Sequence, residues 1–241
     1  MILLNNMTIV VKKRIVDIPS KIDPAINLLK LIAMIAMTID HIGHFLYPNA
    51  VWFRLVGRIA APIFAYLIVM GLKNTKSLSQ YVWRLVVLAI ISQVVFFLTT
   101  SHAMLNIIFN FLGIIVLTKG PIWLKPVLIP IYLLFDIELG WLILAIGVIY
   151  YYCKCSQFQP FLVLTATILY CFSYIWAGYS LEFYAIQLMA GITGFLILIV
   201  NNLSDWLRES KLLMRFWPRY IFYAYYPLHW LVLYTIKTLV G

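Results

Sequence analysis

The chain has 241 residues, of which 64% are hydrophobic and only 11% are charged. Water-soluble domains contain about 25% charged residues, so this composition excludes a soluble enzyme and predicts an all-α, polytopic integral membrane protein. The net charge of +10 does not indicate nucleic-acid binding, because the basic residues are scattered between apolar segments and do not form one basic, aromatic-rich surface.

Taken in order, residues 1–25 form a basic segment and residues 26–241 a single transmembrane domain. Pro24 suits the start of the first helix, because proline is tolerated in the first helical turn. Apolar runs separated by polar, glycine or proline breaks then predict a bundle of about nine transmembrane helices. The expected spans are 24–46, 51–72, 80–99, 105–117, 123–135, 139–153, 160–176, 181–200 and 220–240.

The fourth, fifth and sixth of these spans are short. Each has about 13 to 15 residues, whereas a helix that crosses a bilayer usually needs about 17 to 25. Two arrangements remain open: three complete crossings, or a helical hairpin that enters the membrane without crossing it fully.

The distribution of positive charge predicts the orientation. With nine spans and a cytoplasmic N-terminus, every Lys and Arg except Arg54, Arg58 and Lys237 falls on the cytoplasmic side. Cytoplasmic loops are enriched in Lys and Arg, so the pattern predicts that the N-terminus is cytoplasmic. The same orientation places Asp136 and Glu138 on the outer side.

A group of polar residues falls at similar depth in the outer half of four predicted spans. A charged side chain near the bilayer centre costs about 2.5 kcal/mol or more, so such residues are expected to face a partner, a cavity or a reaction. The group consists of Asp40, His41, His44, Arg54, Arg58, His102, Asn106 and His229.

These residues suit acid–base chemistry. His41 is our candidate general base, because imidazole titrates near neutral pH, and His229 is the alternative base at a similar depth. Arg58 is the expected partner of Asp40, because a guanidinium matches a carboxylate in shape and charge. The bland alternatives are a hydrogen bond between helices for His41 and a buried ion pair for Asp40 and Arg58.

Asn106 and Arg58 are also candidate donors to an oxyanion in a site that excludes water. The alternative for Asn106 is to cap a helix. His41 and His44 lie one helical turn apart, a spacing used by metal sites. The sequence has no HExxH motif, paired cysteine ligands or acidic cluster, so we predict no metal.

A basic segment precedes the last predicted span. It contains two aromatic residues and cations typical of cytoplasmic anchoring, and it would also suit a phosphorylated cytosolic donor such as a coenzyme A. The candidate donor-binding residues are Arg208, Lys211, Arg215, Trp217 and Arg219.

Several motifs resemble the TraX family in order and spacing. They are LKLIAMIAMTIDHIGHFLYP at 29–48, RLVGRIAAPIFAYLIVMGL at 54–72, LNIIFNFLG at 105–113 and RFWPRYIFYAYYPLHWLVL at 215–233. The middle of the chain, 120–205, adds nothing specific to the resemblance.

The resemblance implies a multi-pass acetyltransferase of the bacterial inner membrane that uses acetyl-CoA as acyl donor. The first described family member acetylates the N-terminal amine of F-type pilin, so a pilin subunit is the expected acceptor. The matching positions are Asp40, His41, Arg58, Asn106 and His229, while His44 and Arg54 are supporting residues. The roles given above for these residues are our assignment.

Two alternatives stay open. The same scaffold could acylate a glycan or lipid carrying an amine or hydroxyl, or another amine-bearing acceptor. A member of a different class, a small proton-coupled transporter, would use Asp40 and His41 as a proton relay. Inverted repeats or paired broken helices would favour transport, and the sequence shows neither.

Overall fold

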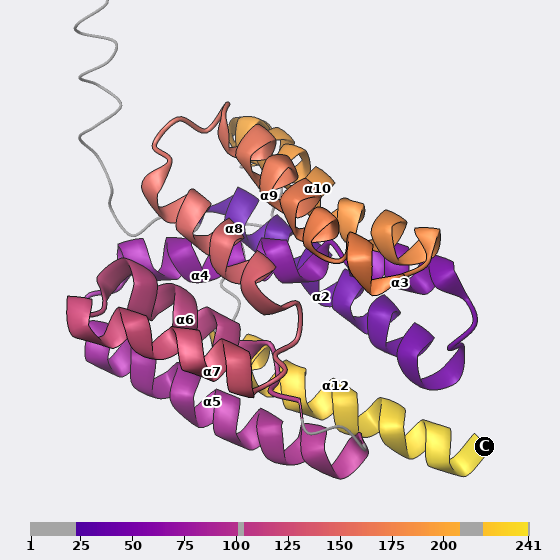
Figure 1. The fold of residues 1–241 in the computed structure, drawn as a ribbon. Coiled ribbons are helices and arrows are strands. Elements are labelled where there is room, and N and C mark those ends of the chain that lie inside the picture. Colours follow the sequence, from indigo (N-terminus) through magenta and orange to yellow (C-terminus); the bar gives the residue numbers. More distant parts are fainter. Residues whose placement is uncertain (1–22, 101–103, 208–218, 241) are drawn as a thin grey trace, which may run out of the picture.

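The computed structural model describes residues 23–100, 104–207 and 219–240 (Figure 1). Two predicted features lie outside this part of the chain: the basic N-terminal segment, which precedes residue 23, and His102. So do four predicted donor-binding residues, Arg208, Lys211, Arg215 and Trp217, and the structure describes only the backbone of Arg219.

The described residues form an all-helical bundle. The α-helices are α2 (Pro24–Leu46), α3 (Val51–Gly57), α4 (Ala60–Asn74), α5 (Leu78–Thr99), α6 (Ile108–Lys119), α7 (Leu128–Leu134), α8 (Gly140–Tyr152), α9 (Gln159–Ser173), α10 (Leu181–Asn202), α11 (Ser204–Leu207) and α12 (Arg219–Val240). Two short 3-10 helices, η1 (Ile122–Val127) and η2 (Ile175–Ala177), precede α7 and follow α9.

Five helical segments in the described chain are long and apolar enough to cross a membrane. They are Pro24–Leu46, Val51–Asn74, Leu78–Thr99, Gln159–Ala177 and Leu181–Asn202. The chain is therefore a multi-pass membrane protein, while the count of nine spans and the cytoplasmic N-terminus remain predictions. The segments expected to be short are short, since α6 has 12 residues and α8 has 13.

Helix α2 begins where the sequence predicted. The carboxylate of Asp23 accepts a hydrogen bond from the backbone N–H of Ala25 at 2.9 Å, and Pro24 occupies the first turn. One face of the helix is buried against its neighbours, and Asp40 and His41 lie on that buried face in the last two turns before the helix ends at Leu46. The apolar pattern of α2 thus also determines where its two polar residues point.

A break between α3 and α4 brings a second charged residue to the same place. The two helices together form one long apolar segment, and Arg58 lies at the turn between them. Gly57 packs directly on Asp40, because a Cβ added at Gly57 would lie 2.2 Å from the Cβ of Asp40. The close approach of the two backbones therefore depends on this glycine.

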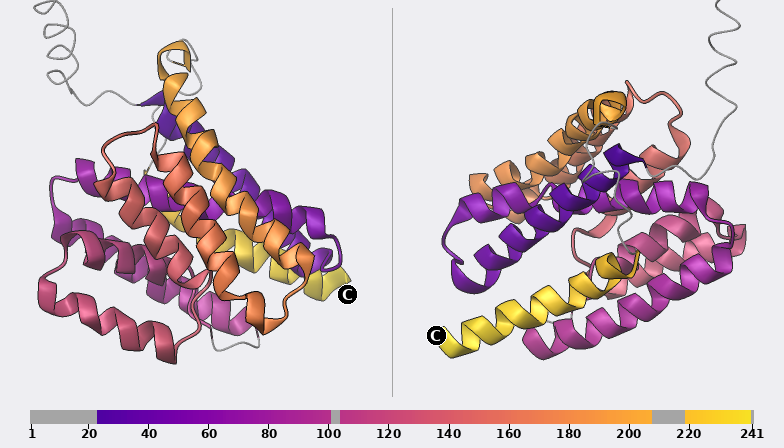
Figure 2. Two further views of the ribbon diagram at one scale, coloured as in Figure 1. Left: turned by 45° about the horizontal axis from the view of Figure 1, so that its top comes forward. Right: turned by 180° about the vertical axis from the view of Figure 1, so that it is seen from behind.

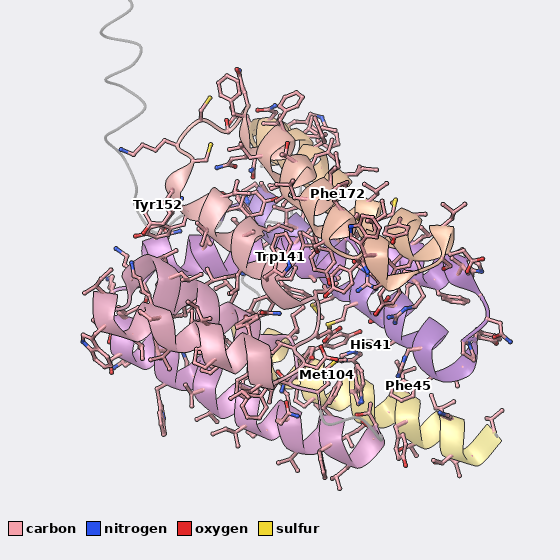
Figure 3. All side chains as sticks on the ribbon, in the orientation of Figure 1. His41, Phe45, Met104, Trp141, Tyr152 and Phe172 are labelled. Atoms are coloured by element: carbon pink, nitrogen blue, oxygen red, sulfur yellow. The ribbon has the colours of Figure 1, made fainter. Side chains whose placement is uncertain are left out.

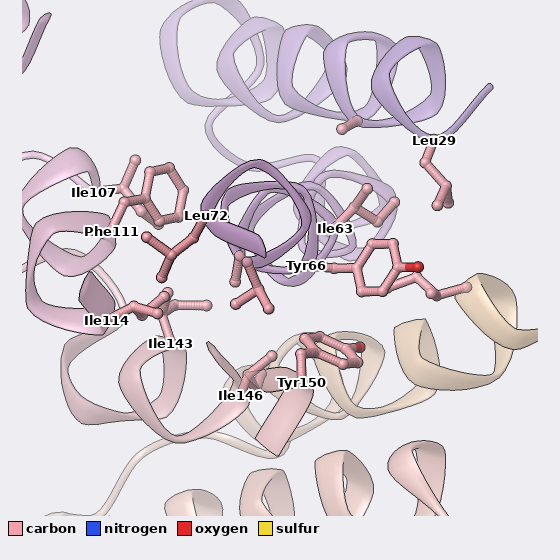
Figure 4. Close-up of a cluster of buried hydrophobic side chains, with 14 of the residues drawn as sticks. Leu29, Ile63, Tyr66, Leu72, Ile107, Phe111, Ile114, Ile143, Ile146 and Tyr150 are labelled. Atoms are coloured by element: carbon pink, nitrogen blue, oxygen red, sulfur yellow. The ribbon is translucent and has the colours of Figure 1, made fainter. Parts of the chain in front are cut away.

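The helices are arranged around α2 and α4. Helices α9 and α10 pair along their length on one side, and α12 lies beside α5 on the other, also touching α2 (Figure 2). The main apolar core lies where α2, α4, α6 and α8 meet, and Figure 4 shows Leu29, Ile63, Ile143 and Tyr150 within it.

The short helices α6, η1, α7 and α8 form a compact unit whose connecting loop folds back into the molecule. The backbone N–H of Leu105 donates to the carbonyl of Asp136 at 2.8 Å, and the N–H of Glu138 donates to the carbonyl of Leu105 at 3.2 Å. Ile137 between them is buried. This loop therefore reaches the centre of the bundle, where its Glu138 meets the residues of α2 and α4.

Candidate functional site

Two cavities meet at the polar centre of the bundle. The wide cavity has a volume of about 1320 Å³ and the narrow cavity one of about 270 Å³. The residues that line both are Asp40, His41, Arg58, Glu138 and Leu139. A molecule in either cavity would thus reach the same small group of charged and imidazole side chains.

Asp40 pairs with a different arginine from the one expected. Nη1 of Arg54 lies 2.9 Å from Oδ2 of Asp40, in a hydrogen-bonded salt bridge. The prediction that Arg58 is the direct partner was therefore wrong. The reason is geometric, since Arg54 lies on α3 facing α2, whereas Arg58 lies at the turn that follows α3.

Arg58 remains available to a ligand. Its buried Nε has no hydrogen-bond partner within the described chain, and the side chain lines both cavities. Oδ1 of Asp40 is buried and unpartnered in the same part of the chain. A buried guanidinium nitrogen that has no hydrogen-bond partner in the described chain and lies beside a cavity is suited to bind an oxygen that carries or develops negative charge.

His41 and His229 form a hydrogen-bonded pair. Nδ1 of His41 lies 2.6 Å from Nε2 of His229, and Nδ1 of His229 lies 2.8 Å from the backbone carbonyl of Tyr225. A carbonyl only accepts, so Nδ1 of His229 must donate and its Nε2, in the neutral ring, must accept. His41 then donates through Nδ1, which leaves a lone pair on its Nε2.

Aromatic rings hold this pair in position. The ring of Trp230 meets His41 edge-on at a centroid distance of 4.2 Å, and Tyr225 stacks on His229 at 5.0 Å. The indole N–H of Trp230 donates to the hydroxyl of Thr99. In Figure 3, His41 lies close to Phe45 in the region between α2 and α12. The two histidines differ in position, because His41 lines both cavities whereas His229 lines neither.

Asn106 is fully buried but serves the backbone. Its amide nitrogen donates to the carbonyl of Ala89 at 3.0 Å and to Oε1 of Gln93 at 2.9 Å. Its Oδ1 accepts from the N–H of Ile108 at 3.0 Å. Both amide hydrogens are engaged, so in this structure Asn106 is not placed to donate to an oxyanion, and the N-cap residue of α6 is Ile107.

Glu138 is a site residue that the sequence argument missed. It lines both cavities beside Asp40 and Arg58, although its position in a short acidic turn suggested the outer surface. Burial raises the pKa of its carboxyl above the ordinary value. The signal available in the sequence was an acidic residue between two helices too short to cross the membrane.

His44 lies near the mouth of the wide cavity. It is exposed and lines that cavity together with Arg54. The described residues contain no group of three His, Cys, Asp or Glu side chains that could hold a metal ion. His44 therefore lies beside the acid–base group but one helical turn away from its centre.

The comparison with protein families agrees with this arrangement of motifs. A family model described as TraX protein matches residues 25–237, nearly the whole chain. The chain belongs to the TraX family. The match includes both cavities and every site residue described above.

A relative of this TraX-family chain is an uncharacterized protein from Rickettsia prowazekii (strain Madrid E). The two are 58% identical over 40 residues, which is 17% of this chain and 16% of the relative. The match thus spans only a small part of the relative's length. No solved structure is similar to the chain.

Proposed function

We propose that this TraX-family protein transfers an acetyl group from acetyl-CoA to the N-terminal amine of a pilin subunit. The observation that carries the proposal is His41, which lines both cavities and whose Nδ1 is engaged by His229, beside Arg58, whose buried Nε has no hydrogen-bond partner within the described chain. In a two-substrate reaction without a covalent enzyme intermediate, donor and acceptor must reach the same base at the same time. The two cavities would give each substrate its own route to His41.

The narrow cavity suits the donor. Its lining residues include Lys30, Gly71, Tyr81 and Tyr223, which lie near the ends of α2, α4, α5 and α12 that the positive-inside pattern assigns to the cytoplasm. Its volume of about 270 Å³ lies below the roughly 300–1,000 Å³ of ordinary ligand pockets, so it fits a slender chain better than a nucleotide. The nucleotide of the donor would stay on the cytoplasmic side.

The wide cavity suits the acceptor. It is lined by His44, Arg54 and Thr100, which lie toward the opposite ends of α2, α3 and α5, and it also extends along α6 and η1 to Leu117 and Lys125. At about 1320 Å³ it has room for the end of a peptide chain. A pilin N-terminus on the outer face of the inner membrane would enter from this side.

In the proposed reaction, the neutral amine attacks the thioester carbonyl and a C–N bond forms. Nε2 of His41 takes a proton from the nitrogen, and the guanidinium of Arg58 stabilises the oxyanion of the tetrahedral intermediate. The C–S bond then breaks, and the proton held by His41 passes to the sulfur, so coenzyme A leaves as a thiol. His229 keeps His41 in the required tautomer, and Arg54 keeps the Asp40 carboxylate in place beside Arg58.

The test is acetyl transfer by the purified protein in proteoliposomes, with labelled acetyl-CoA and a peptide that begins with a pilin-type free amine. His41→Ala should reduce transfer by about 10²–10⁴-fold, the usual contribution of a general base. The control for expression, purification and reconstitution is Ser173→Ala. This residue lies at the end of α9 and outside both cavities. Full activity in His41→Ala would overturn the assignment.

The acceptor class is tested in the same assay. Peptides with a free or a blocked N-terminus, an amino sugar and an aminolipid are compared at equal concentration. Labelling of the free peptide alone supports the pilin-type acceptor. Labelling of the sugar or the lipid alone would replace it, and labelling of none, with a folded protein, would argue for the proton-relay alternative.

A further inference from the structure

One stripe of α2 lines the narrow cavity from end to end. It consists of Lys30, Met34, Met37 and His41, spaced four, three and four residues apart, so the four side chains share one face of the helix. A cation therefore lies at one end of an apolar slot and the proposed base at the other. The two ends of the stripe are therefore complementary to an elongated ligand: the cation would contact an anionic head, and the base would contact a reactive end.

The walls opposite this stripe are apolar over the same length. Phe64, Leu67 and Ile68 of α4 and Leu85 and Leu88 of α5 line the cavity. Tyr226 of α12 also lines it, and its buried hydroxyl has no hydrogen-bond partner in the described chain. A ligand with an apolar body and an amide group would satisfy both the walls and this hydroxyl.

The length of the stripe provides a quantitative match. Eleven residues separate Lys30 from His41, a rise of about 16 Å along the helix. In the phosphopantetheine arm of a coenzyme A thioester, thirteen bonds join the phosphorus to the sulfur. An extended chain advances by about 1.2 Å per bond, so the arm spans about 16 Å.

We propose that the ammonium of Lys30 binds the phosphate at the head of the donor's phosphopantetheine arm, so that α2 sets the distance from this phosphate to the thioester beside His41. The inference rests on the proposed function and names the residue that anchors its donor. Tyr226 would bind an amide of the arm. The ligand chemistry recognised by Lys30 is a phosphate ester, which a lipid headgroup also carries.

The experiment compares three acetyl donors: acetyl-CoA, S-acetyl-phosphopantetheine and S-acetyl-pantetheine, which lacks the phosphate. For the first two, Lys30→Gln should raise KM by about 10- to 100-fold, the effect of losing a charge-assisted hydrogen bond. For the third it should leave KM unchanged, which also shows that the variant is folded. Lys30→Arg should restore most of the loss.

The matched control is Lys76→Gln, which removes an equivalent charge from an exposed position outside both cavities. It should behave as wild type with all three donors. Tyr226→Phe should raise KM equally for all three, because the amides are common to them.

The possible outcomes distinguish failure of the Lys30 assignment from failure of the proposed acetyl-transfer function. If the wild type turns over none of the donors, the proposed function fails and the Lys30 assignment falls with it. If the wild type is active but Lys30→Gln has unchanged KM values, or an equal increase for all three donors, only the Lys30 assignment fails. If the Lys30→Gln effect depends on anionic lipid in the vesicles and not on the donor's phosphate, Lys30 binds a lipid headgroup instead.

Discussion

Nδ1 of His41 lies 2.6 Å from Nε2 of His229, and the carbonyl of Tyr225 engages the other nitrogen of His229. This chain fixes which nitrogen of each ring bears the proton. His229 therefore has a positioning role that needs no contact with substrate: its hydrogen bond fixes the tautomer of His41 that carries the lone pair on Nε2.

His229→Ala should therefore lower kcat by about 100-fold or more while leaving KM for the donor near its wild-type value, because the base loses its preferred tautomer. His229→Gln should recover much of that loss, since one amide can both donate to Tyr225 and accept from His41. The measurement is a kcat and KM comparison over a range of pH. Equal activity of the alanine and glutamine variants would argue against a proton-positioning role.

The Asp40–Arg54 salt bridge should contribute to stability as a pair. Asp40→Asn removes the carboxylate that forms the salt bridge with Arg54, and removing one partner of a buried pair costs about 3–5 kcal/mol. We expect a smaller cost here, about 1–3 kcal/mol, because the Arg54 side chain is 31% exposed. A double-mutant cycle with Arg54→Gln, measured by unfolding in detergent, gives the coupling. Additive effects would show that the two charges act independently.

Much of the site was predictable from hydropathy and charge. Polar and charged side chains inside membrane helices cost free energy and usually have a partner or a function. Asp40, His41, Arg58 and His229 could therefore be singled out without a structure. Helical spacing alone does not say which arginine faces a carboxylate on another helix. The pairing of Arg54 with Asp40 depends on how α3 packs on α2, which is a tertiary property.

The role of Asn106 and the position of Glu138 could not be predicted for a related reason. Asn106 lies just before α6, and whether its amide faces a cavity or the backbone of α5 depends on the approach of α5. Glu138 appeared to be a solvated turn residue, because a connecting loop normally lies on the surface. Its return to the bundle centre depends on the backbone pairing of Leu105 with the 136–138 segment.

Gly57→Ala tests the contact between α2 and the turn at Arg58. The new Cβ would lie 2.2 Å from the Cβ of Asp40, so one backbone must move and the site should lose at least 10-fold in kcat. Gly113→Ala is the comparison, because its Cβ meets chiefly the flexible end of Leu144. Activity assays and thermal unfolding of both variants check this expectation. Equal losses in the two would mean that the packing at Asp40 is not special.

Glu138 should make the stability of the protein depend on pH. Burial raises the pKa of its carboxyl in the folded state, so the folded protein binds this proton more tightly than the unfolded chain. Stability should then fall as pH rises from the unfolded pKa, about 4.3, through the raised folded value. The glutamine in Glu138→Gln cannot ionise, so the Tm of this variant should fall less over the same pH interval.

The check is a series of Tm measurements in detergent for both proteins. Glu182→Gln is the control, because Glu182 is exposed at the start of α10. Parallel curves for wild type and Glu138→Gln would show that folding does not raise the pKa of this carboxyl.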